Sequence, residues 1–540
     1  MTDSGTGTTT EKVTDIKKKV KKRAAEEAQS YPVLIKSNGH LPTPYVQQCM
    51  AANELGDGLL FASVLRNQYL YNASAGEWLR WCGHSWGIDI RETHLAAVEQ
   101  VVDKLLDTTG RIGEEIQECV KEGNEAKRDQ LGKLRERIYG RIARFRTDKG
   151  RNTTVKFART CREPLAINGD ELDLNPHLLA CANGVLDIRT AKFREGRPEE
   201  LISKASPVEW QGLEMPAPTW EKFLMEVQQE SQETVSFLQR WFGYSISGII
   251  KEHKFLILEG PGGRNGKGTM METIAEVLGP LAGPIQSEML LDQGHTRSSA
   301  APSPDIMGLR GQRLVWASES DEGRRFSPSR VKWLSGGDTL TGRYPHDKYP
   351  IRFRPTHKLV LLTNSKPMAP ADDFPFWERL LLVVFFLSYV DRDPVSTHER
   401  RANKDLREQL RAEASGILAW LVRGYLEYQR QGLNPPKAVL EATAKYRRDE
   451  DILAPFIEEH ITVNTLARTP ASELYDRFLK WYEDNVSKKG ISQTRFGRIM
   501  GKRFERDKIE GRSVYVGIEL NPECPVCKRY HQKQALCPNI

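Results

Sequence analysis

Residues 260–269 read "GPGGRNGKGT". A short apolar run, "FLILEG" (255–260), precedes them and has the character of a buried strand. The following residues, "KGTMMETIAEVLGP" (267–280), place their apolar side chains on one helical face before Gly-Pro ends the pattern. A glycine-rich loop between a strand and a helix points backbone N–H groups and the positive helix end at one spot. The sequence therefore predicts a nucleotide-phosphate site here.

The loop departs from the usual phosphate-binding pattern. Gly268 stands directly after Lys267, where a Ser or Thr is usual, so Thr269 is the nearest hydroxyl that could serve Mg²⁺. Lys267 itself would reach the β- and γ-phosphates. The alternative is a glycine-rich turn with a chance lysine, which the flanking strand and helix disfavour. The predicted ATP-binding residues are Gly260, Gly262, Gly263, Asn265, Gly266, Lys267, Gly268 and Thr269.

Two further apolar runs end in polar residues. "LVWAS" in 312–322 is followed by Glu319, at the strand end where open α/β sheets bind ligands, and it is the predicted Mg²⁺ carboxylate. "HKLVLLTN" (357–364) ends in Asn364, which could position an attacking water or simply form the turn before "SKP". Between them, 338–355 reads as a hairpin with Arg343, His346 and Lys348 at its tip, although basic hairpin tips are common on protein surfaces.

Five motifs follow one another in a recognisable order: "GPGGRNGKGT", "RLVWASE", "LSGGDTLTGR", "HKLVLLTNSKP" and "DDFPFWERLLLVVFF". Together they resemble the superfamily 3 helicases, in the branch of phage and plasmid primase-helicases, over residues 45–510. The resemblance implies an α/β fold with an AAA+-type P-loop ATPase core. It also implies a homo-oligomeric ring, a hexamer by analogy, that binds ATP between subunits and moves 3′ to 5′ on single-stranded DNA.

The resemblance assigns roles to individual residues. Lys267 and Thr269 bind phosphate and Mg²⁺, Glu319 is the acidic Walker B residue, and Asn364 is the sensor. Arg379, in "FWERL", matches an arginine finger that would complete the neighbouring subunit's site. The basic hairpin would line the central channel, with Lys348 gripping the DNA backbone. Ser320 stands where some members carry a second acidic residue, and the extra glycine of Gly262-Gly263 would be absorbed as a bulge.

The chain divides by composition into five segments. A disordered basic tail (1–35) precedes a mixed α+β helicase-associated domain (36–210) and the ATPase domain (211–395). A C-terminal helical and winged-helix domain (396–520) and a zinc-binding tail (521–540) complete it. The longest apolar run, "LLLVVFFL" (380–387), is too short to span a bilayer and reads as a strand, so we expect a cytoplasmic protein with no membrane contact.

Positive charge gathers near the C-terminus. Residues 487–512 carry a net +6 of the chain's +7, the pattern expected for binding phosphate backbones. "TPASELYDRFLKWYEDN" (469–485) predicts a helix capped by Thr469, and "SQTRFGRIMGKRF" (492–504) a second, amphipathic helix. With "SVYVGIEL" as a wing, this resembles a winged helix. The DNA candidates are Arg495, Arg498 and Lys502, the alternative being a merely solvated basic helix.

Four residues of metal-ligating types, three cysteines and one histidine, lie in the last 17 residues. The zinc spacing Cys-x₂-Cys and four ligands suggest a structural site, the alternative being free thiols in a flexible tail. The other cysteines are scattered, as in reduced cytosolic proteins. The zinc candidates are Cys524, Cys527, His531 and Cys537.

The sequence thus favours an ATP-dependent DNA helicase of phage or plasmid replication, with ATP and Mg²⁺ as cofactors. Its expected partners are single-stranded or forked DNA, further copies of itself, and a separate primase or polymerase. No acidic catalytic cluster precedes the core, so we expect no primase activity. An origin-binding ATPase that initiates replication without processive unwinding is the alternative, and a metabolic P-loop kinase a distant third.

Overall fold

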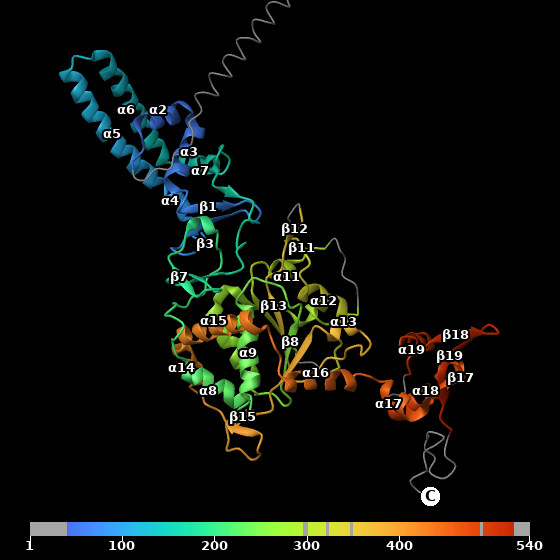
Figure 1. Cartoon of the computed structure of the whole chain (residues 1–540). Helices are drawn as coiled ribbons and strands as arrows, with labels where there is room; N and C mark the ends of the chain where they lie inside the picture. The colour runs from blue at the N-terminus through green and yellow to red at the C-terminus, as the bar shows by residue number, and fades with distance from the viewer. Residues whose placement is uncertain (1–39, 295–300, 320–322, 346–348, 487–489, 523–540) are drawn as a thin grey trace, which may run out of the picture. The chain divides into compact units, whose positions relative to one another are not determined.

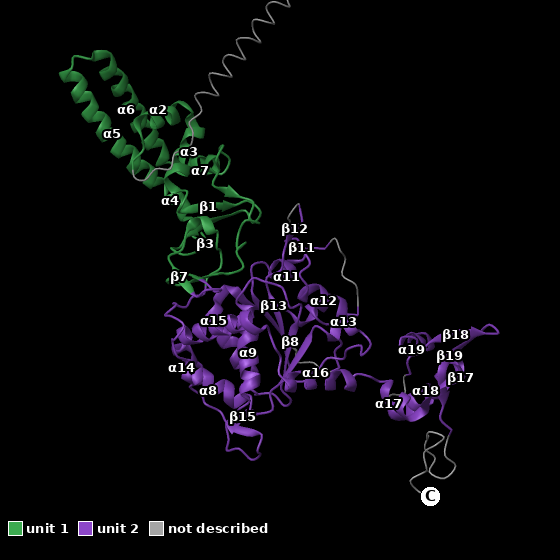
Figure 2. Cartoon of the chain, in the orientation of Figure 1, with its two compact units in different colours: residues 1–186, 192–205 green, residues 187–191, 206–540 purple. Residues whose placement is uncertain are grey.

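The computed structural model describes residues 40–294, 301–319, 323–345, 349–486 and 490–522 (Figure 1). Two compact units make up the chain: residues 1–186 with 192–205, and residues 187–191 with 206–540 (Figure 2). The expected tail 1–35 and the four Cys/His zinc candidates lie outside the described residues. Across the described helices, none is both long enough and apolar enough to cross a membrane.

The first unit combines a helical part with small sheets, as the mixed α+β prediction expected. Helices α5 (Val98–Lys121) and α6 (Glu125–Phe145) form a long hairpin (Figure 1), and the Asn124 side chain caps α6 by accepting from Lys127 N at 3.1 Å. The buried ion pair Arg141–Asp57 ties α6 to α3. Strands β1 to β4 form a sheet in the order β3-β2-β1-β4, and β5 to β7 a second one. The remaining elements are α2 (Thr43–Ala51), α3 (Asn53–Leu65), α4 (Thr93–Ala96), α7 (Asp148–Ala158), β1 (Tyr69–Asn72), β2 (Glu77–Trp81), β3 (Trp86–Ile88), β4 (Ala166–Ile167), β5 (Leu178–Cys181), β6 (Gly184–Asp187), β7 (Lys192–Arg194) and η1 (Pro198–Glu200).

The second unit is built on a five-stranded sheet with the order β14-β8-β13-β10-β9. Every neighbouring pair is parallel, so all five carboxyl ends lie at one edge. Side chains of both faces are buried, which explains why these strands read as continuous apolar runs. The strands are β8 (Phe255–Glu259), β9 (Ala282–Pro284), β10 (Leu314–Glu319), β13 (Lys358–Thr363) and β14 (Leu380–Val384).

Helices cover this sheet and separate its strands. On one face, α12 (Pro328–Ser335), α13 (Phe374–Trp377) and α16 (Lys437–Asp449) contribute Val331, Phe376 and Tyr446 to a core shared with Phe255 and Leu361. The other helices and short elements of this part are α8 (Pro218–Val227), α9 (Gln232–Ser245), α10 (Lys267–Leu278), α11 (Pro304–Met307), α14 (Leu406–Ala412), α15 (Ala414–Gln431), β11 (Leu340–Gly342), β12 (Ile351–Phe353), β15 (Ser388–Val390), β16 (Glu399–Arg401), η2 (Gly279–Leu281) and η3 (Ser287–Met289).

The C-terminal part places three helices beside an antiparallel sheet of order β17-β19-β18. Aromatic side chains fill its core, among them Phe456, Phe478 and Phe496. The predicted cap of α18 is wrong by one residue: Thr469 belongs to β17 and its hydroxyl donates to Ile518 O at 2.6 Å, because pairing with β19 extends the strand to Pro470. The elements are α17 (Ala454–His460), β17 (Ile461–Pro470), α18 (Ala471–Asn485), α19 (Gln493–Met500), β18 (Arg506–Ile509) and β19 (Arg512–Leu520).

Candidate functional site at the carboxyl edge of the sheet

The glycine-rich loop joins β8 to α10, as the sequence predicted. Gly262, Gly263, Arg264 and Gly266 all have left-handed φ angles, between 52° and 82°. Gly266 caps α10, and a side chain there would meet Val227 Cγ1 at 2.9 Å. A glycine is therefore needed at this position both for its backbone angle and for the close approach of α8. The resulting turn directs consecutive backbone amides and the first turn of α10 to one place, a geometry that suits an anion.

Lys267 is the buried charge of this loop. Its Nζ donates to Gly260 O at 3.0 Å, to Asn265 Oδ1 at 3.0 Å and to Asn364 Oδ1 at 3.1 Å. All three acceptors are neutral. Burial lowers the pKa of Lys267 to about 8, although the negative charge of Glu259 acts in the opposite direction. The structure thus brings together Lys267, Asn265 and Asn364, three of the predicted site residues.

The strand register aligns the ends of β8, β13 and β10. Thr363 pairs with Glu259 on one side and with Glu319 on the other. The backbone of Glu319 therefore lies two strands from the glycine-rich loop, about 10 Å away. Asn364 follows Thr363 directly and its side chain is exposed apart from the contact with Lys267. The predicted carboxylate strand and the predicted sensor strand thus end at the same edge as the loop.

The loop is also hydrogen-bonded to the end of the apolar run 380–387 and to the residues just after it, a contact that the sequence did not predict. Asn265 Nδ2 donates to Leu387 O at 2.8 Å and to Phe385 O at 3.3 Å, and Tyr389 N donates to Arg264 O at 2.8 Å. Residues 385–389, which we call the β14 exit segment, lie about 120 residues beyond the loop, so no local pattern could have connected the two. Asn265 thus holds the loop in shape, a role that its place in the motif did not reveal.

The first turn of α10 carries the two residues whose roles the sequence left open. Gly268 is exposed, and a Cβ added there would meet nothing within 4 Å. Thr269 is half-buried. Among the described residues, no group of three or more His, Cys, Asp or Glu side chains is arranged to hold a metal ion.

Arg379 lies at the opposite edge of the sheet. Its carbonyl accepts from Phe255 N at 2.7 Å, at the amino end of β8, and its Nη1 donates to His253 O at 3.4 Å. The five residues of β8 separate it from the loop, a distance of roughly 16 Å. Arg379 therefore cannot reach the loop of its own chain.

The basic hairpin is formed as expected, from antiparallel β11 and β12. Its turn end is bonded to the residue that precedes α11, because Arg343 N donates to Ser303 Oγ at 3.1 Å and Ser303 N donates to Arg343 O at 2.8 Å. His346 and Lys348, at the predicted tip, lie outside the described residues.

The three predicted DNA contacts of the C-terminal part differ in their surroundings. Arg498 is exposed on α19 and Arg495 is half-buried there. Lys502 follows the helix and forms an ion pair with Asp372. The next residue, Arg503, binds Asp451 through both carboxylate oxygens, each at 2.7 Å. Two basic side chains of this region are thus occupied by carboxylates.

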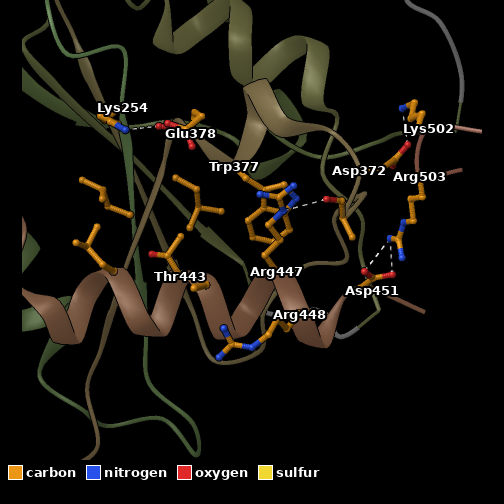
Figure 3. A pocket seen from close by; sticks show the side chains of 15 residues that line it. Lys254, Asp372, Trp377, Glu378, Thr443, Arg447, Arg448, Asp451, Lys502 and Arg503 are labelled. Carbon is orange, nitrogen blue, oxygen red and sulfur yellow. Dashed lines mark hydrogen bonds and ion pairs between the residues drawn. The ribbon is translucent and has the colours of Figure 1, made fainter. Parts of the chain in front are cut away.

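These ion pairs border a cavity of about 700 Å³ between β14, α13, α16 and residues 502–503 (Figure 3). Trp377 lies on its wall, and Lys254 binds the carbonyl oxygen of Glu378 at one end. The cavity thus lies where residues 502–503 of the C-terminal part are bound by Asp372, before β14, and by Asp451, after α16.

Comparisons with known proteins find viral proteins that are named putative helicases and putative primases. Residues 58–229 match the family described as "D5 N terminal like". The chain is 28% identical to the putative helicase L207/L206 of Acanthamoeba polyphaga mimivirus, over 59% of this chain and 34% of that protein. It is 25% identical to the putative helicase 121R of Invertebrate iridescent virus 3, over 60% of this chain and 37% of that one. A putative primase, C962R of African swine fever virus, is also 25% identical, over 59% of this chain and 34% of the relative.

The chain thus spans about a third of the length of the curated relatives it matches. Among solved structures, the apo C-terminal region of NrS-1 aligns with a TM-score of 0.34 and 13% identity, covering 57% of this chain and 76% of that one. Taken together, the family match and the viral relatives make this chain similar to the D5-like primase-helicases of large DNA viruses.

Proposed function

We propose that the chain is an ATP-dependent DNA helicase of the superfamily 3 type. The observation that carries this proposal is the position of Lys267, buried in the glycine-rich loop and hydrogen-bonded to Asn364 of the neighbouring strand. A charged lysine bound only to neutral oxygens is ready to exchange them for phosphate oxygens, which compensate its charge better. Asn364 would then face the terminal phosphate.

Each residue of the site has a definite task under this proposal. The loop amides and Lys267 bind the phosphates, and Asn364 orients the attacking water. Thr269 and Glu319 would hold Mg²⁺, which neutralises charge on the phosphates when it is bound. Gly268 lacks the usual hydroxyl, so Thr269 is the residue on the first turn that can supply one.

The opposite position of Arg379 supports a ring. The loop lies at the carboxyl edge of the sheet and Arg379 at the amino edge. If copies assemble head to tail, the amino edge of one subunit meets the carboxyl edge of the next, and a heterologous contact of this kind forms a ring when its rotation closes. Arg379 would then stabilise charge developing on the neighbour's ATP.

DNA would contact the basic hairpin and the C-terminal part. Arg343 stands at the turn end of β11 in the hairpin, and Arg498 is an exposed basic side chain of α19. Phosphate contacts of this type bind strongly and without sequence preference. The relatives named putative helicases and putative primases support DNA as the substrate.

The test is Lys267→Ala, assayed for DNA-stimulated ATP hydrolysis and for strand displacement on a tailed duplex. We expect both activities to fall by at least about a hundredfold, since one preorganised charge contact contributes about 3–4 kcal/mol to such transition states. Arg264→Ala is the matched control, because Arg264 is exposed in the same loop and bound to Asp391. Unwinding that survives Lys267→Ala would refute the proposal, and hydrolysis without any strand displacement by the unaltered protein would favour the origin-binding ATPase.

A further inference from the structure

The neighbours of β8 set the direction in which a bound nucleotide lies. Asn364 follows β13 and Glu319 is the last residue of β10, and both strands lie on one side of β8. The terminal phosphate must lie on that side if these residues act on it. The nucleotide base, at the other end of the molecule, then lies on the remaining side of the loop, toward β14. This argument rests on the proposed ATP site.

The β14 exit segment, residues 385–389, occupies that side. Asn265 Nδ2 donates hydrogen bonds to the carbonyl oxygens of Phe385 and Leu387, on either side of Phe386, and Tyr389 N donates to the loop carbonyl of Arg264. Ser388 Oγ donates to a further loop carbonyl, that of Gly263, at 3.3 Å. The segment is therefore held at the loop along its length.

Within this segment Phe386 is the exception to burial. Phe385 and Leu387 are 0% and 2% exposed, whereas the Phe386 side chain is 55% exposed. The carbonyl groups on both sides of Phe386 accept hydrogen bonds from Asn265, so the backbone that carries the exposed ring is held next to the loop. An exposed aromatic ring carried beside a phosphate site offers the stacking surface that a purine base needs.

We infer that Phe386 stacks on the base of the bound nucleotide and that the β14 exit segment forms the base side of the site. Stacking depends on the flat face of the base and hardly on its edge groups. The contact therefore adds affinity for ATP and GTP alike and adds none for a triphosphate without a base.

Phe386→Ala tests this inference through two ligands, ATP and ribose 5′-triphosphate, which is ATP without its base. We expect the ATP dissociation constant to rise about tenfold, the effect of losing one base–aromatic stack. The inhibition constant of ribose 5′-triphosphate against ATP hydrolysis should stay the same within twofold. Phe386→Trp should keep ATP affinity, and circular dichroism would verify that both variants are folded.

The matched control is Phe374→Ala, because Phe374 is 57% exposed and lies in α13, away from the loop. It should leave ATP affinity unchanged. Unchanged ATP binding in Phe386→Ala would overturn the inference. An equal loss for both ligands would overturn it too, since Phe386 would then only support the loop. Absence of ATP binding by the unaltered protein would instead remove the proposed function.

Discussion

At the scale of single residues, Lys267 concentrates the chemistry of the candidate site. Its ammonium group is buried against neutral oxygens, and burying a charge in this way is unfavourable. A bound phosphate would compensate the charge and remove this penalty. The same penalty lowers the pKa of Lys267 to about 8. Because the pKa of Lys267 in the folded protein lies below the ordinary value for lysine, the charge on Lys267 destabilises the folded protein when no ligand is bound. This destabilisation is complete below pH 8 and disappears as the pH rises from 8 to about 10.4.

This pKa makes a prediction for ligand binding. Below pH 8 Lys267 is already charged and ATP affinity should change little with pH, whereas above pH 8 binding must first take up a proton. We expect affinity to fall by up to about tenfold per pH unit above 8, with proton uptake visible by calorimetry in buffers of different ionisation enthalpy. Lys267→Arg is the control, since arginine stays charged throughout. Proton uptake of equal size in that variant would contradict the assignment.

At the scale of elements, α10 depends on α14 as well as on the sheet. Glu276, near the end of α10, binds Arg407 at 2.6 Å and Arg411 at 2.7 Å. The pKa of Glu276 is lowered to about 2, and the hydrogen bond from Arg411 is the largest contribution to this shift. These two ion pairs join α10, which begins at the glycine-rich loop, to α14, about 130 residues further along the chain. They therefore connect the candidate site to the helices that follow the sheet.

Glu276→Gln should destabilise this junction by about 0.5–1 kcal/mol at pH 7, because the Glu276 side chain is one-third exposed and solvent weakens the pair. Since the folded pKa is lowered, the contribution is complete above about pH 4.5 and is lost as the pH falls toward 2. The urea midpoint for loss of amide-exchange protection in α10 measures it. Glu272→Gln, exposed one turn earlier on the same helix, should have no comparable effect; equal shifts for both would contradict the prediction.

At the scale of the whole molecule, the sheet separates two halves of one proposed reaction. The loop with Lys267 is at one edge and Arg379 is at the other, so a single chain cannot bring them together. Assembly is then a condition of hydrolysis, and native mass should show a ring of several copies under the conditions in which ATP is hydrolysed.

Mixed rings test this arrangement. Lys267→Ala and Arg379→Ala should each lack ATP hydrolysis, while rings co-assembled from both variants should recover up to about a quarter of the normal rate, since one interface in four then joins two intact edges. Steady-state hydrolysis before and after co-expression measures the recovery. The model in which two subunits share one ATP site would be contradicted if Arg379→Ala hydrolysed ATP at the normal rate. It would also be contradicted if the mixed rings recovered no activity.

The sequence by itself determined the elements of the core. "FLILEG", "LVWAS" and "HKLVLLTN" are strands β8, β10 and β13, and the helix after Lys267 ends near Gly279 as predicted. These assignments succeed because burial on both faces of a parallel sheet and one-sided burial of a helix leave periodic patterns in the chain. The predicted Thr469 cap failed for the complementary reason: a strand partner some 50 residues away competed with a local signal.

Only the tertiary structure decided how these elements meet. The contacts of Lys267 with Asn364, of Asn265 with the β14 exit segment, and of Lys502 with Asp372 each join residues about 100 or more positions apart. Such contacts follow from strand order and register, which depend on the packing of distant segments and leave no periodic mark in the sequence. For the same reason, the motif predicted where a phosphate would bind, while the exposed Phe386 on the base side emerged only from the fold.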